Sequence, residues 1–390
     1  YHGNNWALSG ELHGFQTITA DEKPYEKLPQ IRLTGSQPIG EHSNLGYTAE
    51  YTYFTRDNES FTGSARVTGS RVHLAPALSY NYSRVWGYAK PQAKLWATHY
   101  ELDDQVAGLD DAPSYSVPVL SFDSGLYFDR DLASGGVHSL EPRLFALYVP
   151  DVSQTEAPDF DTSAFDLTYD ALFRDNRFSG KDRIGDAQQI SLGVTNRFFR
   201  ANGTEQAYIS LGQAYYFDNF TTDVAGTQVS TASSSDIAMQ SAWFYSDKTR
   251  LTLDNLFARS NGKAISSAFK VSHADGYDKQ ASLQYLYAEN DHDQADLQFI
   301  WPLSQKWATI GRWHYDLESN ENIERLVGLE YESCCWRVQT FVRDWLEDDD
   351  QFNQGVFLRF VLKGLGSIGT ASEFLDDVKG FTKREERNEY

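Results

Sequence analysis

The sequence predicts an all-β protein, a transmembrane antiparallel β-barrel of the outer-membrane type. Apolar and polar residues alternate along many short segments of the 390-residue chain. Aromatic residues make up 14% of it, while its mean hydropathy is -0.52. No run approaches the roughly 18 consecutive apolar residues of a transmembrane helix. A polar average with many aromatic residues and alternating segments is typical of a membrane barrel, whose single strands carry a weak signal.

The segment 355–363 shows the alternation most clearly. Successive side chains of a strand point to opposite faces of its sheet. One face would carry Val356, Leu358, Phe360 and Leu362, and the other Gly355, Phe357, Arg359 and Lys363. The same pattern predicts strands within 45–53, 71–82, 190–197, 251–254, 295–301 and 336–343. We count about eighteen such segments, each near the roughly 9–11 residues of a tilted membrane strand.

The connections between these segments alternate in length. Short ones lie around 83–85, 246–248, 302–305 and 333, and longer polar ones at 101–116, 150–186, 218–235 and 347–350. Outer-membrane barrels have short periplasmic turns and longer extracellular loops. The short set, with Cys334 and Cys335, is therefore predicted to be periplasmic, as is the chain after Lys363. The 150–186 connection is rich in aromatic residues, so we expect it to fold into the barrel lumen or onto a partner.

The net charge of -21 argues against a nucleic-acid partner, which needs a basic surface, and against simple attraction to anionic lipid. No cofactor motif, zinc spacing or Ser-His-Asp set stands out, so the chain is not expected to be an enzyme. The glycines of 364–369 match the spacing of a dinucleotide fingerprint. Without a βαβ unit they are interpreted as a flexible exit from the last strand. The acidic run 348–350 is interpreted as a solvated turn rather than a divalent-cation site.

Cys334 and Cys335 are the two cysteines of the chain. Direct neighbours cannot easily form a disulfide with each other, because the bond has a preferred Cα separation and dihedral. Disulfides persist in the oxidising periplasm. Two interpretations stay open. Both residues pair with cysteines elsewhere, in a missing upstream part or in another chain, or both are free thiols.

Several stretches, in the family's order, resemble the C-terminal barrel part of the LptD family of lipopolysaccharide-assembly proteins. The most specific is the pair of cysteines that follows Tyr-Glu-Ser within 331–335. The others are 27–30, 94–100, 140–143 followed by 147–150, 172–175 with 182–184, 212–217 and 359–367.

The resemblance implies a barrel of about two dozen strands that is preceded by a periplasmic jellyroll domain. We therefore expect residues 1–365 to be the C-terminal part of this barrel, without the jellyroll and the first strands. Residues 366–390 would be a periplasmic tail. The resemblance also implies lipopolysaccharide as cargo, the lipoprotein LptE as a plug of the lumen, outer-membrane lipids around the barrel, and a periplasmic bridge that reaches the missing domain. It implies no cofactor, no metal and no nucleic acid.

The resemblance assigns roles to particular residues. Cys334 and Cys335 would form disulfides with the missing N-terminal domain. The last strand would be one side of a lateral gate, through which lipopolysaccharide leaves into the outer leaflet, and would contribute Gly355, Val356, Leu358, Phe360 and Leu362. The 150–186 loop would meet LptE through Leu172, Phe173, Arg174, Asp175, Asp182 and Arg183.

Three other functions are compatible with the strand pattern. About eighteen strands close into a porin-sized barrel, so a general diffusion channel is the main alternative. An outer-membrane protease or lipase would need a convergent catalytic set at one rim. A β-rich carbohydrate binder would be soluble without detergent.

Overall fold

The computed structural model describes residues 1–15, 24–56, 61–224, 232–276, 278–346 and 351–363, together with the backbone of Gly366–Gly369. Two compact units are present. The first comprises Tyr1–Arg130, Ser139–Thr195 and Leu211–Asp236, and the second Asp131–His138, Asn196–Ser210 and Ile237–Tyr390. Among the described residues, no helix is both long and apolar enough to cross a membrane.

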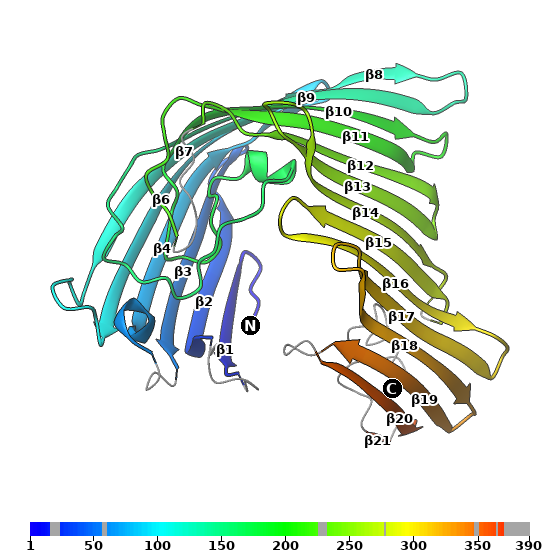
Figure 1. Cartoon of the computed structure of the whole chain (residues 1–390). Coiled ribbons are helices and arrows are strands. Elements are labelled where there is room, and N and C mark those ends of the chain that lie inside the picture. The colour runs from blue at the N-terminus through cyan, green and yellow to red at the C-terminus, as the bar shows by residue number, and fades with distance from the viewer. Residues whose placement is uncertain are drawn as a thin grey trace. The chain divides into compact units, whose positions relative to one another are not determined.

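The first unit is built, wholly or in part, from strands β1 to β11 and two short 3-10 helices (Figure 1). The strands are β1 Trp6–His13, β2 Glu26–Pro38, β3 Ser43–Thr55, β4 Thr68–Tyr80, β5 Tyr82–Arg84, β6 Gly87–Asp103, β7 Ser114–Leu126, β8 Phe128–Asp131, β9 Val137–Val149, β10 Ala187–Phe199 and β11 Glu205–Tyr216. The helices are η1 Gly63–Arg66 and η2 Asp170–Phe173.

Strands of the first unit pair antiparallel in the order of the chain: β1 with β2, β2 with β3, β3 with β4, β4 with β6, β6 with β7 and β7 with β9. Strand β4 shows that the sheet of the first unit has two different faces. Arg71 and His73 are buried, whereas Val72 and Leu74 between and beyond them are exposed. Glu50 lies opposite His73 in the register and so shares its face. We call the side that carries Glu50, Arg71 and His73 the polar face.

The second unit is a run of antiparallel hairpins, each strand paired with the next. Its strands are β12 Ile237–Ser246, β13 Thr249–Phe257, β14 Ala264–Ala274, β15 Gln280–Ala288, β16 His292–Pro302, β17 Trp307–Asp316, β18 Glu321–Glu332, β19 Trp336–Leu346, β20 Phe352–Leu362 and β21 Gly366–Gly369. The described part of the chain thus contains 21 strands, and 18 remain without the short β5, β8 and β21. The predicted all-β antiparallel class and the strand estimate are both confirmed.

Strand β20 has the two faces that the sequence predicts. Val356 and Leu358 are 75% and 59% exposed, while Arg359 and Val361 are buried. On the buried side of the neighbouring strands, Ile300, Ile310, Leu326 and Phe341 form an apolar cluster. An exposed row of large apolar side chains is unfavourable in water and suits contact with lipid acyl chains.

The connections alternate in length most clearly in the first unit. Residues 39–42 and 85–86 are short turns, whereas 104–113 and 150–186 are long. In the second unit, 289–291 and 317–320 are as short as the turns at the opposite strand ends, so the length difference fades there. The expected long loop at 347–350 lies outside the described residues.

The end of the chain differs from the expectation of a flexible exit. Residues Gly366–Gly369 form β21 and pair with Arg359–Leu362 of β20, so that interpretation is wrong for these four residues. Backbone hydrogen bonds to an existing strand edge give a glycine-rich segment a place that its own side chains do not specify. The division into a barrel that ends at 365 and a tail at 366–390 stays a prediction, because 370–390 lies outside the described residues.

Candidate functional site

The loop 150–186 lies against the polar face of the first unit instead of extending away from it (Figure 1). Its apolar side chains are packed inward: Phe160, Leu172, Phe173, Phe178 and Ile184 are buried. Burial of several aromatic rings offsets the chain entropy that ordering a long loop costs. The loop is therefore folded against the strands, as its aromatic content predicts.

Arg71 of β4 is the centre of the contact between strands and loop. Its guanidinium is fully buried and donates to three carboxylates. Nη2 lies 3.0 Å from Glu50 Oε1, and Nη1 lies 2.7 Å from Asp161 Oδ1 and 2.5 Å from Asp182 Oδ1. A buried charge is tolerated only when it is paired and hydrogen-bonded, and Arg71 is both.

Asp182 is the loop residue that fits most closely into this centre. Its Oδ2 accepts hydrogen bonds from the backbone N–H groups of Phe160 and Asp161, each at 2.9 Å. Its Oδ1 accepts one from the hydroxyl of Tyr100 at 3.0 Å. A second tyrosine, Tyr115, donates to the carbonyl oxygen of Asp182 at 2.8 Å. The carboxylate therefore joins two strands of the sheet to two parts of the same loop.

Two further cations balance the charge of this group. Lys27 lies 2.9 Å from Asp161, and Arg32 lies 2.7 Å from Glu50. Three cations thus face three carboxylates, and we call Lys27, Arg32, Glu50, Arg71, Asp161 and Asp182 the ion cluster. Burial alone would raise the pKa of Asp161, but the hydrogen bonds and charges of Arg71 and Lys27 outweigh it and hold the pKa well below its ordinary value.

An aromatic layer covers one side of the ion cluster. The ring of Phe160 stacks on that of Phe54 of β3, with centroids 4.4 Å apart and planes at 16°. Tyr25 meets both rings edge-on. The guanidinium of Arg71 lies 4.7 Å from the Phe54 centroid. The rings limit water access, which strengthens the electrostatic attraction within the cluster.

Helix η2 is a second anchor of the loop, and two glycines make room for it. A Cβ atom on Gly193 of β10 would lie 2.7 Å from Phe173 Cζ, and one on Gly212 of β11 would lie 2.9 Å from Leu172 Cδ1. The hydroxyl of Ser191 donates to the Leu172 carbonyl at 2.5 Å. Larger side chains at Gly193 and Gly212 would occupy the space that η2 fills.

A third anchor closes the end of the loop. Asp186 accepts hydrogen bonds from the N–H groups of Thr221 and Thr222 at 2.8 and 2.9 Å, and it pairs with Arg177 at 2.9 Å. Burial would raise its pKa, yet these donors lower it below its ordinary value. The Gln154 side chain completes the closure by accepting from Ile184 N–H and donating to the Ile184 carbonyl, both at 2.9 Å.

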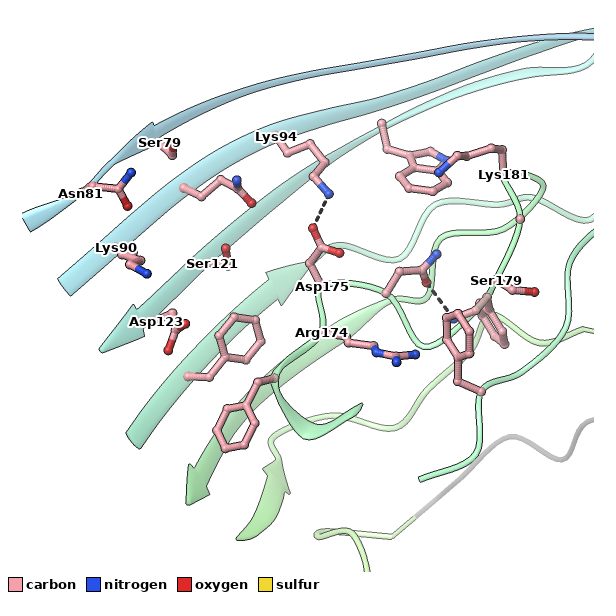
Figure 2. A pocket seen from close by; sticks show the side chains of 18 residues that line it. Ser79, Asn81, Lys90, Lys94, Ser121, Asp123, Arg174, Asp175, Ser179 and Lys181 are labelled. Atoms are coloured by element: carbon pink, nitrogen blue, oxygen red, sulfur yellow. Dashed lines mark hydrogen bonds and ion pairs between the residues drawn. The ribbon is translucent and has the colours of Figure 1, made fainter. Parts of the chain in front are cut away.

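A cavity of about 710 Å³ lies between the loop and the polar-face residues of β4, β6, β7 and β9. Figure 2 shows Lys90, Lys94 and Asp123 on the strands and Arg174, Asp175 and Lys181 on the loop around it. Lys94 and Asp175 form an ion pair across it. Among the described residues, no group of His, Cys, Asp and Glu side chains is placed to hold a metal ion.

The six loop residues predicted to meet a partner fall into two groups. Leu172, Phe173, Asp182 and Arg183 are buried in contacts with this chain. The guanidinium of Arg183, for example, donates to the Ala157 carbonyl at 2.6 Å. Arg174 and Asp175 are less buried and line the cavity, which Phe173 also borders. Contact of these residues with another protein stays a prediction.

The residues predicted at the periplasmic side and at the gate lie in the second unit. Cys334 and Cys335 are exposed in the turn 333–335 between β18 and β19, with their Sγ atoms 2.6 Å apart. Their disulfide partners stay a prediction. Gly355, Val356, Leu358, Phe360 and Leu362 lie on β20. Only its residues Arg359–Leu362 have a second strand partner among the described residues.

The strand side of the ion cluster is not evident from the sequence. Glu50 and Arg71 fall within the predicted strands 45–53 and 71–82, and Lys27 and Tyr100 within the resemblance stretches 27–30 and 94–100, but neither pattern gives these residues a role. A charged residue in the middle of an otherwise alternating membrane strand was the available signal, because such a group needs a buried partner.

Comparison with known proteins identifies the family. The family model LptD, described as LPS transport system D, matches residues 1–307. The LPS-assembly proteins LptD of Hahella chejuensis, Pseudomonas aeruginosa and Marinobacter nauticus are each 35% identical to the chain over 99% of its length. The chain spans about half the length of these relatives, 50%, 51% and 50%.

Two solved receptor structures align with most of the chain at low sequence identity. A ferric enterobactin receptor mutant of Pseudomonas aeruginosa aligns with a TM-score of 0.42 at 9% identity, over 92% of this chain and 68% of the receptor. The ferric preacinetobactin receptor BauA of Acinetobacter baumannii aligns with a TM-score of 0.41 at 10% identity, over 93% of this chain and 69% of the receptor. The relatives and the exposed apolar strand face place the protein among Gram-negative outer-membrane β-barrels. The chain belongs to the LptD family of LPS transport proteins.

Proposed function

We propose that the chain forms much of the barrel of an outer-membrane translocon component that inserts lipopolysaccharide into the outer leaflet. The polar face would line the lumen that passes the saccharide part. The acyl chains would stay in hydrocarbon and leave through a lateral gate in the wall. No bond is made or broken in this process, so the residues act by shape, charge and solvation.

The docked loop is the observation that carries the proposal. A diffusion channel needs an open lumen, whereas the loop 150–186 is fixed on the polar face by the ion cluster, by η2 and by Asp186. A loop held by three separate anchors would narrow the lumen permanently. We propose that LptE fills most of the remaining lumen and meets the loop near Arg174 and Asp175, without entering the cavity that these two side chains line.

The gate proposal rests on strand β20. Its partner β19 covers its full length on one side, while β21 covers only Arg359–Leu362 on the other, among the described residues. The remaining edge, with Gly355, Val356 and Leu358, would be the half of the seam that opens. Glycine adds no side chain to hold the seam, which favours weak pairing there.

The cysteine proposal rests on exposure. Cys334 and Cys335 lie side by side in an open turn, so another domain can reach both. We propose that they form disulfides with an upstream jellyroll domain, which would also connect the barrel to a periplasmic bridge. Mapping the disulfides by mass spectrometry of the full-length protein from outer membranes tests this, and two free thiols in functional protein would contradict it.

The transport proposal is tested by depletion. A strain would carry the full-length gene as its only copy under a controllable promoter. After depletion, pulse-labelled lipopolysaccharide should stop reaching a membrane-impermeant reagent and should remain with the inner membrane. Continued surface delivery, combined with reduced uptake of small solutes, would support the general porin instead.

Conductance separates the two functions in vitro. The full-length protein with its lipoprotein, reconstituted in planar bilayers, should conduct little. Arg71→Met should raise the conductance because it releases the loop, while Arg32→Met, which removes a half-exposed arginine of the same cluster, should not. A large open conductance in the unchanged protein would contradict the translocon proposal.

A further inference from the structure

The cavity between the loop and the strands has an excess of positive charge. Four cations line it: Lys90, Lys94, Arg174 and Lys181. Two carboxylates also line it, and both are already engaged. Arg143 binds Asp123 through two nitrogens, at 2.9 and 2.8 Å, and Lys94 pairs with Asp175. The cavity is therefore positive in a chain whose net charge is -21.

The other three cations lie beside aromatic rings, and in the described part of the chain none of them forms an ion pair within 4.0 Å. Among the described residues, Lys90 lies 4.8 Å from the Tyr88 centroid, Arg174 4.3 Å from that of Phe165, and Lys181 5.1 Å from that of Trp96. A ring attracts a cation but does not neutralise it. Each of these groups keeps its charge available for an anion that enters the cavity.

The charged form of Lys181 is disfavoured by its position among other cations in a partly buried cavity. Burial lowers its pKa, and the nearby charges of Arg32, Lys94 and Arg71 lower it further against the opposing effect of Glu50. An anion in the cavity would favour the charged ammonium and relieve this cost. Lysine and arginine are the side chains that bind phosphate and carboxylate groups most often.

The rest of the lining suits a sugar. Phe165 is exposed, and Trp96 and Phe178 add apolar wall. Asn81, Gln92 and Ser121 supply neutral donors and acceptors for hydroxyl groups. Ring faces beside a few placed polar groups are typical of small-molecule sites, and 710 Å³ lies within their usual size range.

We infer that this cavity binds an anionic saccharide, a sugar that carries phosphate or carboxylate groups. Lys90, Arg174 and Lys181 would contact the anionic groups, and the Phe165 ring would lie against the apolar face of a sugar ring. The inference rests on the proposed function only in taking the saccharide part of lipopolysaccharide as the natural source. The cavity would be a resting site along the saccharide path beside the loop.

The experiment measures binding to the full-length protein with its lipoprotein in detergent, by isothermal titration calorimetry. The probe is the phosphorylated oligosaccharide left after complete deacylation of lipopolysaccharide. Inorganic phosphate and neutral maltotetraose are run beside it. The unchanged protein should bind the phosphorylated probe, bind phosphate more weakly, and not bind maltotetraose measurably.

Variants then locate the site. Arg174→Gln and Lys181→Gln should each lower the affinity for the phosphorylated oligosaccharide about tenfold, because a hydrogen bond to a charged group is lost. Arg174→Lys and Lys181→Arg should retain most of the affinity. Arg84→Gln is the matched control: Arg84 also lies over a ring, 4.4 Å from the Tyr82 centroid, but does not line the cavity. Phe165→Leu should lower the affinity for the oligosaccharide and leave the affinity for inorganic phosphate unchanged.

Each contrary outcome has one meaning. No binding by the unchanged protein, or an equal loss in Arg84→Gln, overturns the site. If phosphate and the oligosaccharide bind with equal affinity and Phe165→Leu has no effect, the cavity binds phosphate alone and the saccharide inference is wrong. Either result leaves the transport proposal intact if depletion still stops surface delivery. Normal delivery after depletion, with the probe still bound, refutes transport and leaves the site standing.

Discussion

Arg71 Nη1 and Asp182 Oδ1 lie 2.5 Å apart, although the two residues are 111 positions apart in the chain and both side chains are fully buried. This pair joins the strand framework of the first unit to the last part of the loop 150–186. The loop is therefore held by a long-range interaction, and its position depends on a few identifiable side chains.

Arg71→Met should release the loop from the ion cluster. The change leaves three carboxylates in a buried site with only Lys27 and Arg32 to balance them. Removing one partner of a buried ion pair costs about 3–5 kcal/mol. Hydrogen exchange of the Phe160 and Asp161 amides, which donate to Asp182, should accelerate strongly. Arg32→Met is the control, because Arg32 is 45% exposed and its loss should cost less than about 1 kcal/mol. Unchanged protection in Arg71→Met would refute the central role of this residue.

Gly193→Ala should loosen η2 without disturbing the ion cluster. The added Cβ would lie 2.7 Å from Phe173 Cζ and from the Tyr169 hydroxyl, so η2 must shift. Overpacking of this kind costs about 1–3 kcal/mol. Exchange should accelerate within 169–174, while the Phe160 amide keeps its protection. Gly10→Ala in β1 is the control, because no heavy atom lies within 4 Å of its added Cβ. Equal effects of both substitutions would argue against the close contact.

Acid should release the end of the loop only at low pH. The pKa of Asp186 is lowered from 3.8 in the folded protein, so the ionised carboxylate stabilises the docked state. This stabilisation is complete above pH 3.8 and is lost as the pH falls through the lower folded-state value. Exchange protection of the Thr221 and Thr222 amides, corrected for the intrinsic rate, should be constant from pH 7 to about 4.5 and then fall. Asp186→Asn should lack this step. A loss between pH 7 and 5 would contradict the assignment.

Cys334 should react with iodoacetamide faster than Cys335 in the reduced protein. The adjacent Cys335, the Ser333 side chain and the charge of Lys363 lower the pKa of Cys334, whereas the adjacent Cys334 raises that of Cys335. The thiolate is the reactive form, so near pH 8 the residue with the lower pKa is labelled first. Peptide mass spectrometry after short pulses measures the two rates. Cys335→Ala should slow labelling of Cys334, since its partner is then absent, and equal rates in the unchanged protein would contradict this prediction.

Leu358→Arg should impair insertion into the membrane. Leu358 lies on the exposed apolar row of β20, where arginine costs about 2–4 kcal/mol near the bilayer midplane and about 0–1 near its surface. Gln354→Arg, on the same face but nearer the strand end, is the matched control. The amount of heat-modifiable, folded protein in outer membranes should fall for Leu358→Arg alone. Equal levels of both variants would argue against lipid contact at this row.

The strands could be predicted from the sequence because their pattern is local. Val356 and Leu358 differ from Arg359 within a few positions, and the alternation directly gives the strand and its two faces. The long loop between β9 and β10 was also recognisable, because its aromatic content distinguishes it from a solvated loop. Connection lengths were less informative in the second unit, where both sets of turns are short.

The contacts within the site could not be predicted in this way. Nothing in the residues around Asp182 points to Arg71, and Lys94 with Asp175 is likewise a pair of distant positions. Such pairs are determined by strand register and by the path of the loop, which no short window contains. Strand β21 was missed for a related reason, because the edge of β20 supplies its hydrogen bonds.

The ion cluster also has a consequence for the order of assembly. It takes Lys27 from β2, Glu50 from β3 and Arg71 from β4, and Tyr100 of β6 adds a donor. The loop carboxylates Asp161 and Asp182 have no complete binding site until all four strands are in register, so we expect the loop to settle last although it is synthesised before β10. A mispaired barrel would leave its aromatic residues exposed. Correct strand pairing and a protected loop would therefore go together, and a mispaired barrel would be the more open to proteolysis at this loop.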